Sequence, residues 1–364
     1  MSVDSPPRPP PFRAEDLSLD ALVPQLILMS SGGHSLVRYH NAVAERHFLV
    51  KSRLMPPGFM TVPKLPGRDA LHCVVPTMYI PAEIGVLKGS RAVLEVIDTE
   101  PLCSVLQLME SVPGGVLDLD TTRYIAACVV LGLEDCHRSR VAYRGLCADT
   151  LVLSADGYAQ LVEFRHARQL LGRTYTICGA PDYMAPEMLE MRGHLEVVDW
   201  WSLGVLIYTM LTGMTPFSLD TEDELQLSYN IVQGQVDLFP EGSEVSQTVP
   251  EEAQAVVEGL LEMDPLRRLG RGNAGLVALK MHPFFSTIDW GLMETGQHLV
   301  PDSLRRAMER FEETEEAAPS PDSPQQLQDF NHHPQGGPPG SELDGHLHPG
   351  GVGGAGGEWG RFVI

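Results

Sequence analysis

Several features that define other protein classes are missing from this chain of 364 residues. Its six cysteines form none of the close pairs of a metal site or a disulfide-rich scaffold, so we expect free thiols in a reducing compartment. They stand at positions 73, 103, 128, 136, 147 and 178. No apolar run approaches the ~20 residues that a membrane helix needs, and the proline-rich start lacks the apolar core of a signal peptide. The sequence therefore predicts a soluble cytoplasmic protein, with the nucleus as the alternative location.

Basic residues are also scarce. The chain has 26 lysines and arginines against 48 aspartates and glutamates, a formal net charge of -22. Such a charge repels nucleic-acid phosphates and anionic lipid, so it argues against both as partners and favours a basic or protein partner. The 43% hydrophobic content indicates a globular body, and the length allows two lobes with a continuous core.

Both ends of the chain differ in composition from this body. Residues 1–20 contain PPRPPP without apolar periodicity, and Pro, Gly, Ser and His dominate residues 318–357. Such compositions cannot bury enough apolar surface to fold, so we expect both segments to be disordered. Just before the second one, SLRRAMERFEETEEA (303–317) predicts a short amphipathic helix with an acidic end.

Three segments between the ends carry clear secondary-structure signals. YIAACVVLGLEDCH (124–137) is apolar around most of its circumference and predicts a buried helix. TLVLSADGYAQLVEF (150–164) predicts a hairpin that turns at Asp156-Gly157. VLQLMESVPGG (105–115) alternates and ends in Pro-Gly-Gly, which predicts a strand.

Two neighbouring fragments, GAPDYMAPE (179–187) and DWWSLG (199–204), resemble the activation segment and following helix of a protein kinase. Together with MDPLRRLGRGNAGLVALKMHPFFSTIDW (263–290) they resemble the AGC group, in particular the ribosomal-protein kinases and their degenerate relatives. The resemblance covers about residues 25–292 and is weak before 105. It implies a monomeric α+β bilobal fold with a β-rich N-lobe (21–112), a helical C-lobe (113–292) and a C-terminal tail (293–364).

The resemblance implies a nucleotide site near the N-terminus. Lys51 matches the ATP-binding lysine, Gly32 matches the middle glycine of the glycine-rich loop, and Val37 matches the valine that packs on adenine. Ser30 and Ser35 replace the outer two glycines, whose missing Cβ atoms let backbone amides approach phosphate. The alternative interpretation is an ordinary hairpin whose glycines only form a turn.

Other residues of the implied nucleotide site depart from the kinase pattern. Leu49 stands where these kinases have an alanine, and its larger side chain would fill space that adenine needs, so we expect ATP binding to be weak or absent. Met109 matches the gatekeeper and Glu110–Val112 the hinge. Glu83, in a helix that starts near Pro81, is the candidate partner of Lys51, the alternative being a solvent-facing acid.

The implied catalytic loop, YRGLCADTLVL (143–153), lacks its chemical groups. Gly145 replaces the general base, Cys147 the lysine that contacts the transferred phosphate, and Thr150 the asparagine that holds a metal ion. A positioned base alone contributes about 10²- to 10⁴-fold in rate, and phosphoryl transfer depends on positioning and charge neutralisation. Ala180 also replaces the threonine that would hydrogen-bond the missing aspartate and lysine.

The metal-binding Asp-Phe-Gly motif of kinases corresponds to Glu163-Phe164-Arg165. Glu163 keeps a carboxylate that could reach a metal ion, although we expect magnesium binding to be weak or absent. Arg165 replaces the glycine that lets this segment flip. Phe164 is interpreted as packing between the lobes rather than as chemistry.

Structural and regulatory positions of the family are kept. Glu187 and Arg268 match a buried ion pair of the large lobe, and Asp199 matches the acid that accepts backbone amides of the catalytic loop. Thr176 matches the phosphorylated threonine of the activation segment, with Arg144 and Arg168 as the clamp for its phosphate. An unmodified Thr176 beside an Arg144 that only packs is the alternative.

Two main hypotheses follow, beside a third in which phosphorylated Thr176 orders its segment and exposes a docking face without any nucleotide. The first is an AGC-type pseudokinase, with phosphotransfer lost or strongly impaired, that acts by protein interaction or as a signalling scaffold. The second is a weakly active, ATP-dependent serine/threonine kinase that uses Lys51 and Glu163 with an unorthodox base.

Overall fold

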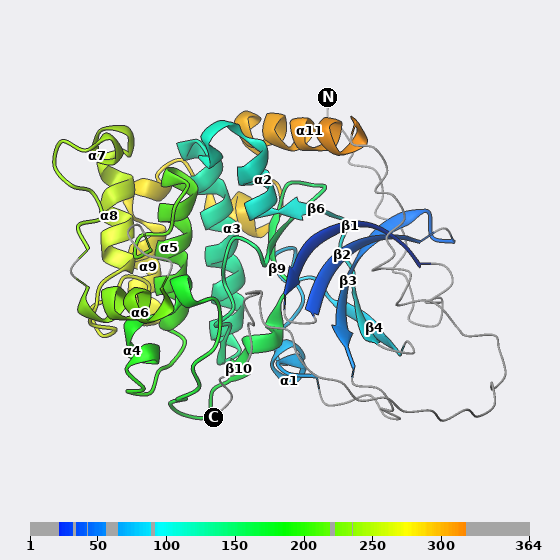
Figure 1. Ribbon diagram of the computed structural model, residues 1–364, viewed down its shortest axis with the longest axis horizontal. Coiled ribbons are helices and arrows are strands. Elements are labelled where there is room, and N and C mark those ends of the chain that lie inside the picture. The colour runs from blue at the N-terminus through cyan, green and yellow to red at the C-terminus, as the bar shows by residue number, and fades with distance from the viewer. Residues whose placement is uncertain are drawn as a thin grey trace, which may run out of the picture.

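The computed structural model describes residues 22–31, 34–41, 43–55, 65–88, 92–218, 223–234 and 236–317. These residues form a β-rich region and a helical region that lie side by side (Figure 1). The segments predicted to be disordered, 1–20 and 318 onward, lie outside the described residues, as does Gly32. Within the described part, no helix is both long and apolar enough to cross a bilayer.

The β-rich region is one antiparallel sheet in the order β1-β2-β3-β5-β4, and the short helix α1 lies between β3 and β4 in the chain. Alternate residues of its strands face opposite sides, so the sheet packs one set of apolar side chains outward and another toward the helical region. Its elements are β1 (Leu22–Ser31), β2 (His34–Asn41), β3 (Arg46–Leu54), α1 (Arg68–Leu71), β4 (Glu83–Lys88) and β5 (Ala92–Ile97).

The helical region contains two small sheets, β6-β8-β9 and β7-β10, on the side that faces the large sheet. It begins with β6 (Pro101–Ser104), α2 (Val105–Ser111), η3 (Pro113–Gly115), α3 (Leu119–Arg138), β7 (Val141–Ala142), β8 (Leu151–Ser154), β9 (Ala159–Leu161), η4 (Phe164–His166) and β10 (Arg168–Gln169). It continues with η5 (Pro181–Tyr183), α4 (Pro186–Leu189), α5 (Val198–Thr212), α6 (Glu224–Gln233), α7 (Glu244–Thr248), α8 (Glu251–Leu260), α9 (Gly272–Lys280), η6 (Pro283–Phe285), α10 (Trp290–Glu294) and α11 (Asp302–Ala317).

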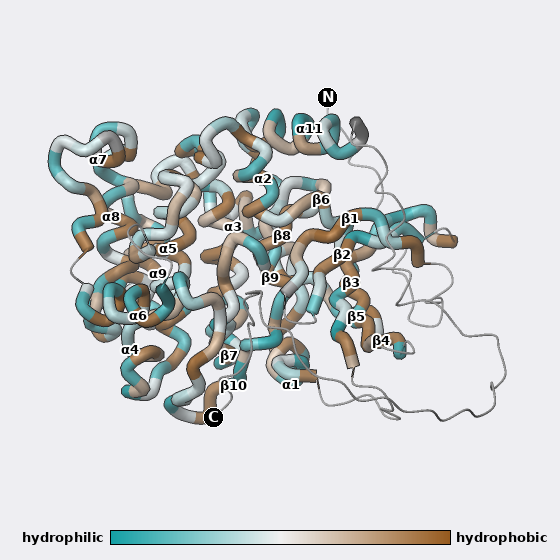
Figure 2. Tube along the Cα trace, viewed as in Figure 1, coloured by the Kyte–Doolittle hydropathy of each residue, from teal (hydrophilic) through white to brown (hydrophobic). Residues whose placement is uncertain are grey.

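Helices α3 and α5 form the centre of the main core. Both are buried along most of their length, and α5 packs against α3 on one side and α8 on the other. Figure 2 shows hydrophobic residues running through α5, α8 and the strands of the large sheet. Asp118 begins α3 by accepting the backbone N–H groups of Asp120 and Thr121, both at 3.0 Å, so the sequence itself fixes where this helix starts.

Several predicted elements are confirmed. The buried helix at 124–137 is the central part of α3, the hairpin at 150–164 is β8 and β9, and the amphipathic helix at 303–317 is α11. Gly157 in the hairpin turn has φ 87°, a backbone conformation that favours glycine.

Two predicted elements are wrong. Residues 105–111 form α2 rather than a strand, because Ser104 and Gln107 make a capping box, in which each side chain binds the other residue's backbone N–H at 3.2 and 3.0 Å. The helix expected from Pro81 is also absent from the structure, since Glu83 opens strand β4, which pairs with β5.

The predicted ion pair between Glu187 and Arg268 forms in the core of the helical region. The arginine donates two hydrogen bonds, of 2.7 and 3.0 Å, to the two carboxylate oxygens, and its side chain is fully buried. The same guanidinium donates to the carbonyl of Glu262 at 3.0 Å and lies 5.1 Å from the ring centre of Trp201. Arg268 thus joins α4, α5 and the loop after α8.

Replacing this arginine should be costly, because Arg268→Ala leaves the Glu187 carboxylate buried without its partner. We expect a loss of about 3–5 kcal/mol in the free energy of unfolding, measured by urea denaturation. Arg267→Ala is the matched control: Arg267 is the preceding residue, is exposed, and pairs with Glu262 only at 3.6 Å, so its removal should cost less than about 0.5 kcal/mol. Equal losses in the two variants would contradict this account.

Candidate nucleotide and catalytic site

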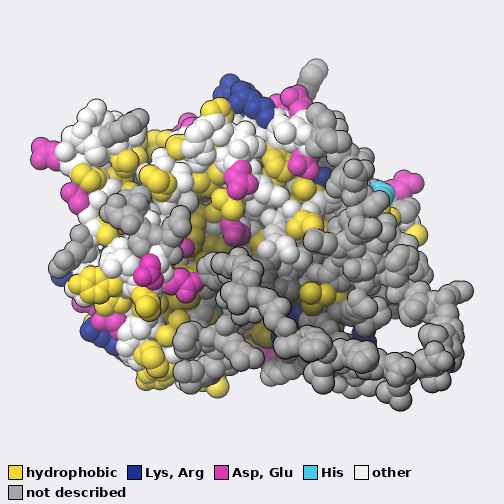
Figure 3. Space-filling model, in the orientation of Figure 1, with side chains coloured by type: hydrophobic (Ala, Val, Ile, Leu, Met, Phe, Trp, Pro, Cys, Tyr) yellow, Lys and Arg dark blue, Asp and Glu magenta, His cyan; other side chains and the backbone are white. Residues whose placement is uncertain are grey.

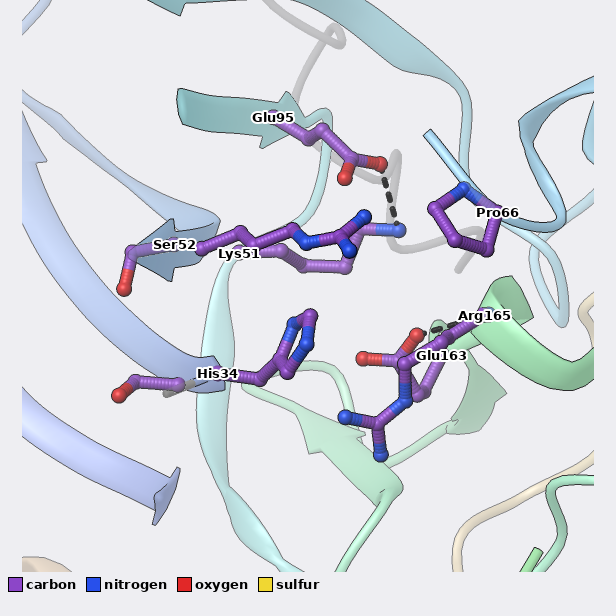
Figure 4. A pocket seen from close by; sticks show the side chains of 9 residues that line it. His34, Lys51, Ser52, Pro66, Glu95, Glu163 and Arg165 are labelled. Atoms are coloured by element: carbon purple, nitrogen blue, oxygen red, sulfur yellow. Dashed lines mark hydrogen bonds and ion pairs between the residues drawn. The ribbon is translucent and has the colours of Figure 1, made fainter. Parts of the chain in front are cut away.

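Lys51, the predicted ATP-binding lysine, lies in the middle of β3 and forms an ion pair within its own sheet. Its Nζ is 2.9 Å from a carboxylate oxygen of Glu95, which stands directly opposite on β5. Figure 4 shows this pair beside Glu163, with Glu95 above the lysine and His34 and Arg165 below it. The lysine therefore has a protein carboxylate as its direct partner.

Charges in this site hold one another in their ionised forms. Burial acts to lower the pKa of Lys51, but Glu163 and Glu95 outweigh it and hold that pKa above its ordinary value. Burial likewise acts to raise the pKa of Glu163, and Lys51 together with Arg165 brings it below its ordinary value. The positive charge of Lys51 is thus balanced by two carboxylates of the same chain.

Little space remains between these side chains. The cavity lined by His34, Lys51, Glu95, Glu163 and Arg165 has a volume of about 20 Å³, room for roughly one water molecule. Pockets for drug-sized ligands measure about 300–1,000 Å³. In this arrangement the residues around Lys51 do not fit a nucleotide.

A compact apolar cluster fills the cleft next to Lys51. Its buried members come from the inner face of the large sheet and from the facing strands of the helical region. They are Leu28, Leu36, Leu49, Ile97, Val152 and Val162, and we call them the Leu49 cluster. Leu49 has no exposed surface, and Val162 directly precedes Glu163. The large side chain at position 49 therefore packs into the junction between the two regions.

Val37 does not lie in this cleft, so its predicted contact with adenine is wrong. In the β2–β3 register Val37 stands opposite Val50, and Leu36 stands opposite Lys51. Val37 packs on the outer side of the sheet with Tyr39 and Phe48, among others. Since successive strand residues face opposite sides, the residue that reaches the cleft is Leu36, one position earlier.

Glu83 is not the partner of Lys51. At the start of β4 its carboxylate accepts hydrogen bonds from Arg68 of α1, the shortest of them 2.6 Å, and this ion pair joins α1 to the sheet. Glu95 takes the predicted role. A sequence signal did exist, because Glu95 is the one charged residue in the apolar run AVLEVI, and a buried charge needs a partner.

The predicted gatekeeper and hinge residues lie elsewhere too. Met109 is on α2, where it is buried in the core of the helical region, and Val112 is the C-cap of that helix. The chain leaves the large sheet earlier, after Ile97 of β5, and enters the helical region through β6. The sequence predicts this connection about ten residues too late, because the alternating pattern of residues 105–111 is typical of a strand.

The backbone of the predicted catalytic loop is hydrogen-bonded to the carboxylate of Asp199. One carboxylate oxygen accepts the backbone N–H of Arg144 at 2.7 Å, and the other accepts that of Tyr143 at 2.9 Å and lies 2.8 Å from Nε2 of His137. Asp199 is fully buried, and Arg144 has φ 56°, a strained conformation for a residue with a Cβ. The acid therefore fixes the loop as predicted.

The residues at the three replaced positions of this loop are hydrogen-bonded to one another. The Thr150 hydroxyl donates to the carbonyl of Gly145 at 2.8 Å and lies 3.2 Å from Sγ of Cys147. Burial raises the pKa of the Cys147 thiol, so it stays protonated and unreactive at neutral pH. The loop offers no general base at position 145 and no cation at position 147.

Glu163 has a local structural partner. Its carboxylate accepts the backbone N–H of Arg165 at 2.8 Å and so caps the short helix η4. The ring of Phe164 packs edge-on against Tyr143, with 5.1 Å between ring centres. Gly67, which has φ 76°, lies so close to the backbone of Phe164 that a Cβ at this position would overlap the Phe164 carbonyl. Among the described residues, no group of three or more potential ligands is arranged to hold a metal ion.

In the activation segment, the arginines of the predicted clamp contact neighbours other than Thr176. Arg168 donates to the hydroxyl of Thr174 at 3.2 Å, and Arg144 donates to the carbonyl of His166 at 2.8 Å. Thr176 is exposed. Its phosphorylation stays a prediction.

Leu49 gives a direct test of the packing in the cleft. Leu49→Ala should lower the free energy of unfolding by about 2–5 kcal/mol, because it removes a fully buried side chain and leaves a cavity between the two regions. Leu54→Ala, at the half-exposed end of the same strand, should cost less than about 0.5 kcal/mol. Urea denaturation measures both, and a small loss at Leu49 would contradict the packing described here.

The buried His194 predicts sensitivity to acid. Burial and the nearby Arg144 lower its pKa from 6.5 to about 4, so the folded protein holds it neutral. Its contribution to stability is complete above pH 6.5, the pKa of the unfolded chain, and is lost as the pH falls toward 4. His194→Gln should therefore lose less stability than the wild-type protein between pH 6.5 and pH 4 in chemical denaturation. Parallel pH profiles would refute this role.

The protein kinase domain family matches residues 88–285. The matched part excludes the strand that carries Lys51, which lies in the region where the sequence resemblance is weakest.

The curated relatives are AGC-group kinases. The chain is 37% identical over 200 residues to serine/threonine-protein kinase N2 of Danio rerio, covering 52% of this chain and 20% of the relative. It is 34% identical over 193 residues to the cAMP-dependent protein kinase catalytic subunit PRKX of Homo sapiens, covering 50% and 51%. For protein kinase C delta type of Mus musculus the identity is 36% over 184 residues, covering 50% and 25%. The chain thus spans between a fifth and a half of the length of these relatives, and it belongs to the protein kinase domain family, within the AGC group of serine/threonine kinases.

Proposed function

We propose that this kinase-fold protein has lost phosphotransfer and acts through protein interaction. The observation that carries the proposal is the filled cleft beside Lys51. The Leu49 cluster occupies the space next to the lysine, and the charged cavity that remains has a volume of about 20 Å³. A nucleotide could enter only after these buried side chains had separated.

The catalytic loop supports the same proposal independently. Phosphoryl transfer requires a positioned base and cations that neutralise the phosphate. Gly145 supplies no side chain, and Cys147 and Thr150 are buried and bonded within the loop. Glu163, the remaining carboxylate, is engaged by the backbone of Arg165 and by the charge of Lys51.

The contacts in the rest of the domain support the proposal that the protein is a stably folded binding module. The Asp199 contacts and the Glu187–Arg268 pair stabilise the helical region without any part in chemistry. The protein keeps the buried charges that hold the fold, while the catalytic-loop positions 145, 147 and 150 carry no charged side chain. This pattern favours a scaffold role over a weakly active kinase.

Nucleotide binding is the sharpest test. The purified full chain should show the same unfolding temperature with and without millimolar ATP, in the presence or absence of magnesium. Binding at a ligand concentration 100 times the dissociation constant would add about 2.7 kcal/mol to the free energy of unfolding. A magnesium-dependent stabilisation that Lys51→Ala abolishes would overturn the proposal.

Phosphate transfer is tested separately from binding. With labelled ATP, magnesium and a mixture of basic and acidic protein substrates, no label above the level of the Lys51→Ala variant should be transferred. Transfer by the wild-type chain alone would establish the alternative, a weakly active ATP-dependent serine/threonine kinase.

A further inference from the structure

A long stretch of the helical region contains no basic residue. Between Gly193 and Leu266 the sequence has no lysine and no arginine, whereas it has 14 aspartates and glutamates. This stretch includes helices α5, α6, α7 and α8. Because no cation of its own offsets these acids, the surface that it forms carries a negative potential.

The same stretch exposes large apolar side chains. On α6, Leu225 and Tyr229 are 81% and 59% exposed and lie one turn apart, so they form a single stripe. The opposite side of the helix, with Leu227 and Ile231, is buried in the core and fixes the orientation of the stripe.

Two exposed methionines lie on segments next to α6. Met191 follows α4, a helix that contacts α6, and Met214 lies three residues before Phe217, whose carbonyl accepts a hydrogen bond from Asn230 of α6. We call Met191, Met214, Leu225 and Tyr229 the α6 surface. Figure 3 shows hydrophobic side chains gathered over the part of the molecule where Figure 1 places α4 and α6, with acidic side chains among them.

Acidic groups border the start of α6, while Arg173 and Arg192 lie beside Met191. Asp223 and Glu224 lie at the start of α6, and both are exposed. Arg192, next to Met191, lies 2.8 Å from the carboxylate of Glu190. Exposed apolar residues bordered by polar ones mark protein-binding sites, and tyrosine and methionine are common at their centres.

We propose that the α6 surface binds a basic amphipathic segment of a partner protein, with its apolar side chains on Leu225 and Tyr229 and its lysines or arginines facing the surrounding acids. This inference rests on the proposed interaction function and names the surface that would carry it. Nucleic acid and anionic membranes do not fit, since both would meet a stretch with 14 acidic residues and no basic residue of its own. A second copy does not fit either, because a symmetric contact would bring two acidic surfaces together.

The test uses a labelled 18-residue peptide of leucine and lysine whose leucines fall on one face of a helix, with binding followed by fluorescence anisotropy. The wild-type chain should bind it, more weakly as salt rises. The double variant Leu225→Ser/Tyr229→Ser should bind about tenfold or more weakly, since it removes the apolar contacts. These side chains are exposed, so the fold should tolerate the change, which circular dichroism checks.

The chain offers a matched control on α9. Val277 and Met281 are also four residues apart and are 56% and 79% exposed, but Lys280 lies between them. Val277→Ser/Met281→Ser should leave peptide binding unchanged. A loss equal to that of the α6 variant would overturn the proposal, as would the absence of binding by the wild-type chain.

Two further outcomes decide against the proposal. If a scrambled peptide of the same composition bound equally well, the binding would depend on net charge alone and not on an apolar helix face. A dimer in sedimentation that the α6 variant disperses would assign the surface to a second copy. The nucleotide and phosphate-transfer tests do not involve the α6 surface, so failure of the proposed function and failure of this inference are distinguishable.

Discussion

The buried carboxylate of Asp199 is the contact on which the rest of the helical region depends. It accepts two backbone N–H groups from the loop at Tyr143 and Arg144 and binds His137 at the end of α3. A charge without exposed surface persists only when hydrogen bonds replace its water. Since Asp199 lies in the first turn of α5, the position of α5 sets the path of the loop and, through Arg144, that of the segment at His166.

The buried charge of Lys51 also needs partners. A buried ammonium needs negative charge nearby, and here Glu95 and Glu163 provide it from within the chain. Glu163 is in turn engaged by the backbone N–H of Arg165. Each of these charges therefore has a partner within the chain, and the apolar side chains of the Leu49 cluster pack across the junction beside them.

Much of the fold could be predicted from the sequence because its signals are local. Asp118 marks the start of α3, Asp156-Gly157 marks the hairpin, and the paired Glu187 and Arg268 lie in motifs with strong resemblance to AGC kinases. The errors fall at or before Val112, and the resemblance is weak before residue 105. There, α2 alternates like a strand but is capped like a helix, and only the capping box distinguishes the two.

The candidate site was harder to predict than the fold, because its geometry depends on register. A difference of one residue places Val37 outside the cleft and Leu36 inside it. The pairing of Lys51 with Glu95 depends on which strands are neighbours, a long-range property that no local pattern carries. By contrast, the replacements at Gly145, Cys147 and Thr150 could be identified from the motif alone, since they lie within one short loop.

The contact between Gly67 and the backbone of Phe164 has a consequence for any compound aimed at this cleft. Opening the cleft would have to part that contact, separate Lys51 from Glu95 and expose the Leu49 cluster. A compound that needs an open cleft would therefore bind more weakly by the free energy that these contacts contribute. Ligand design should therefore begin from the closed surface of the molecule rather than from the shape of a nucleotide.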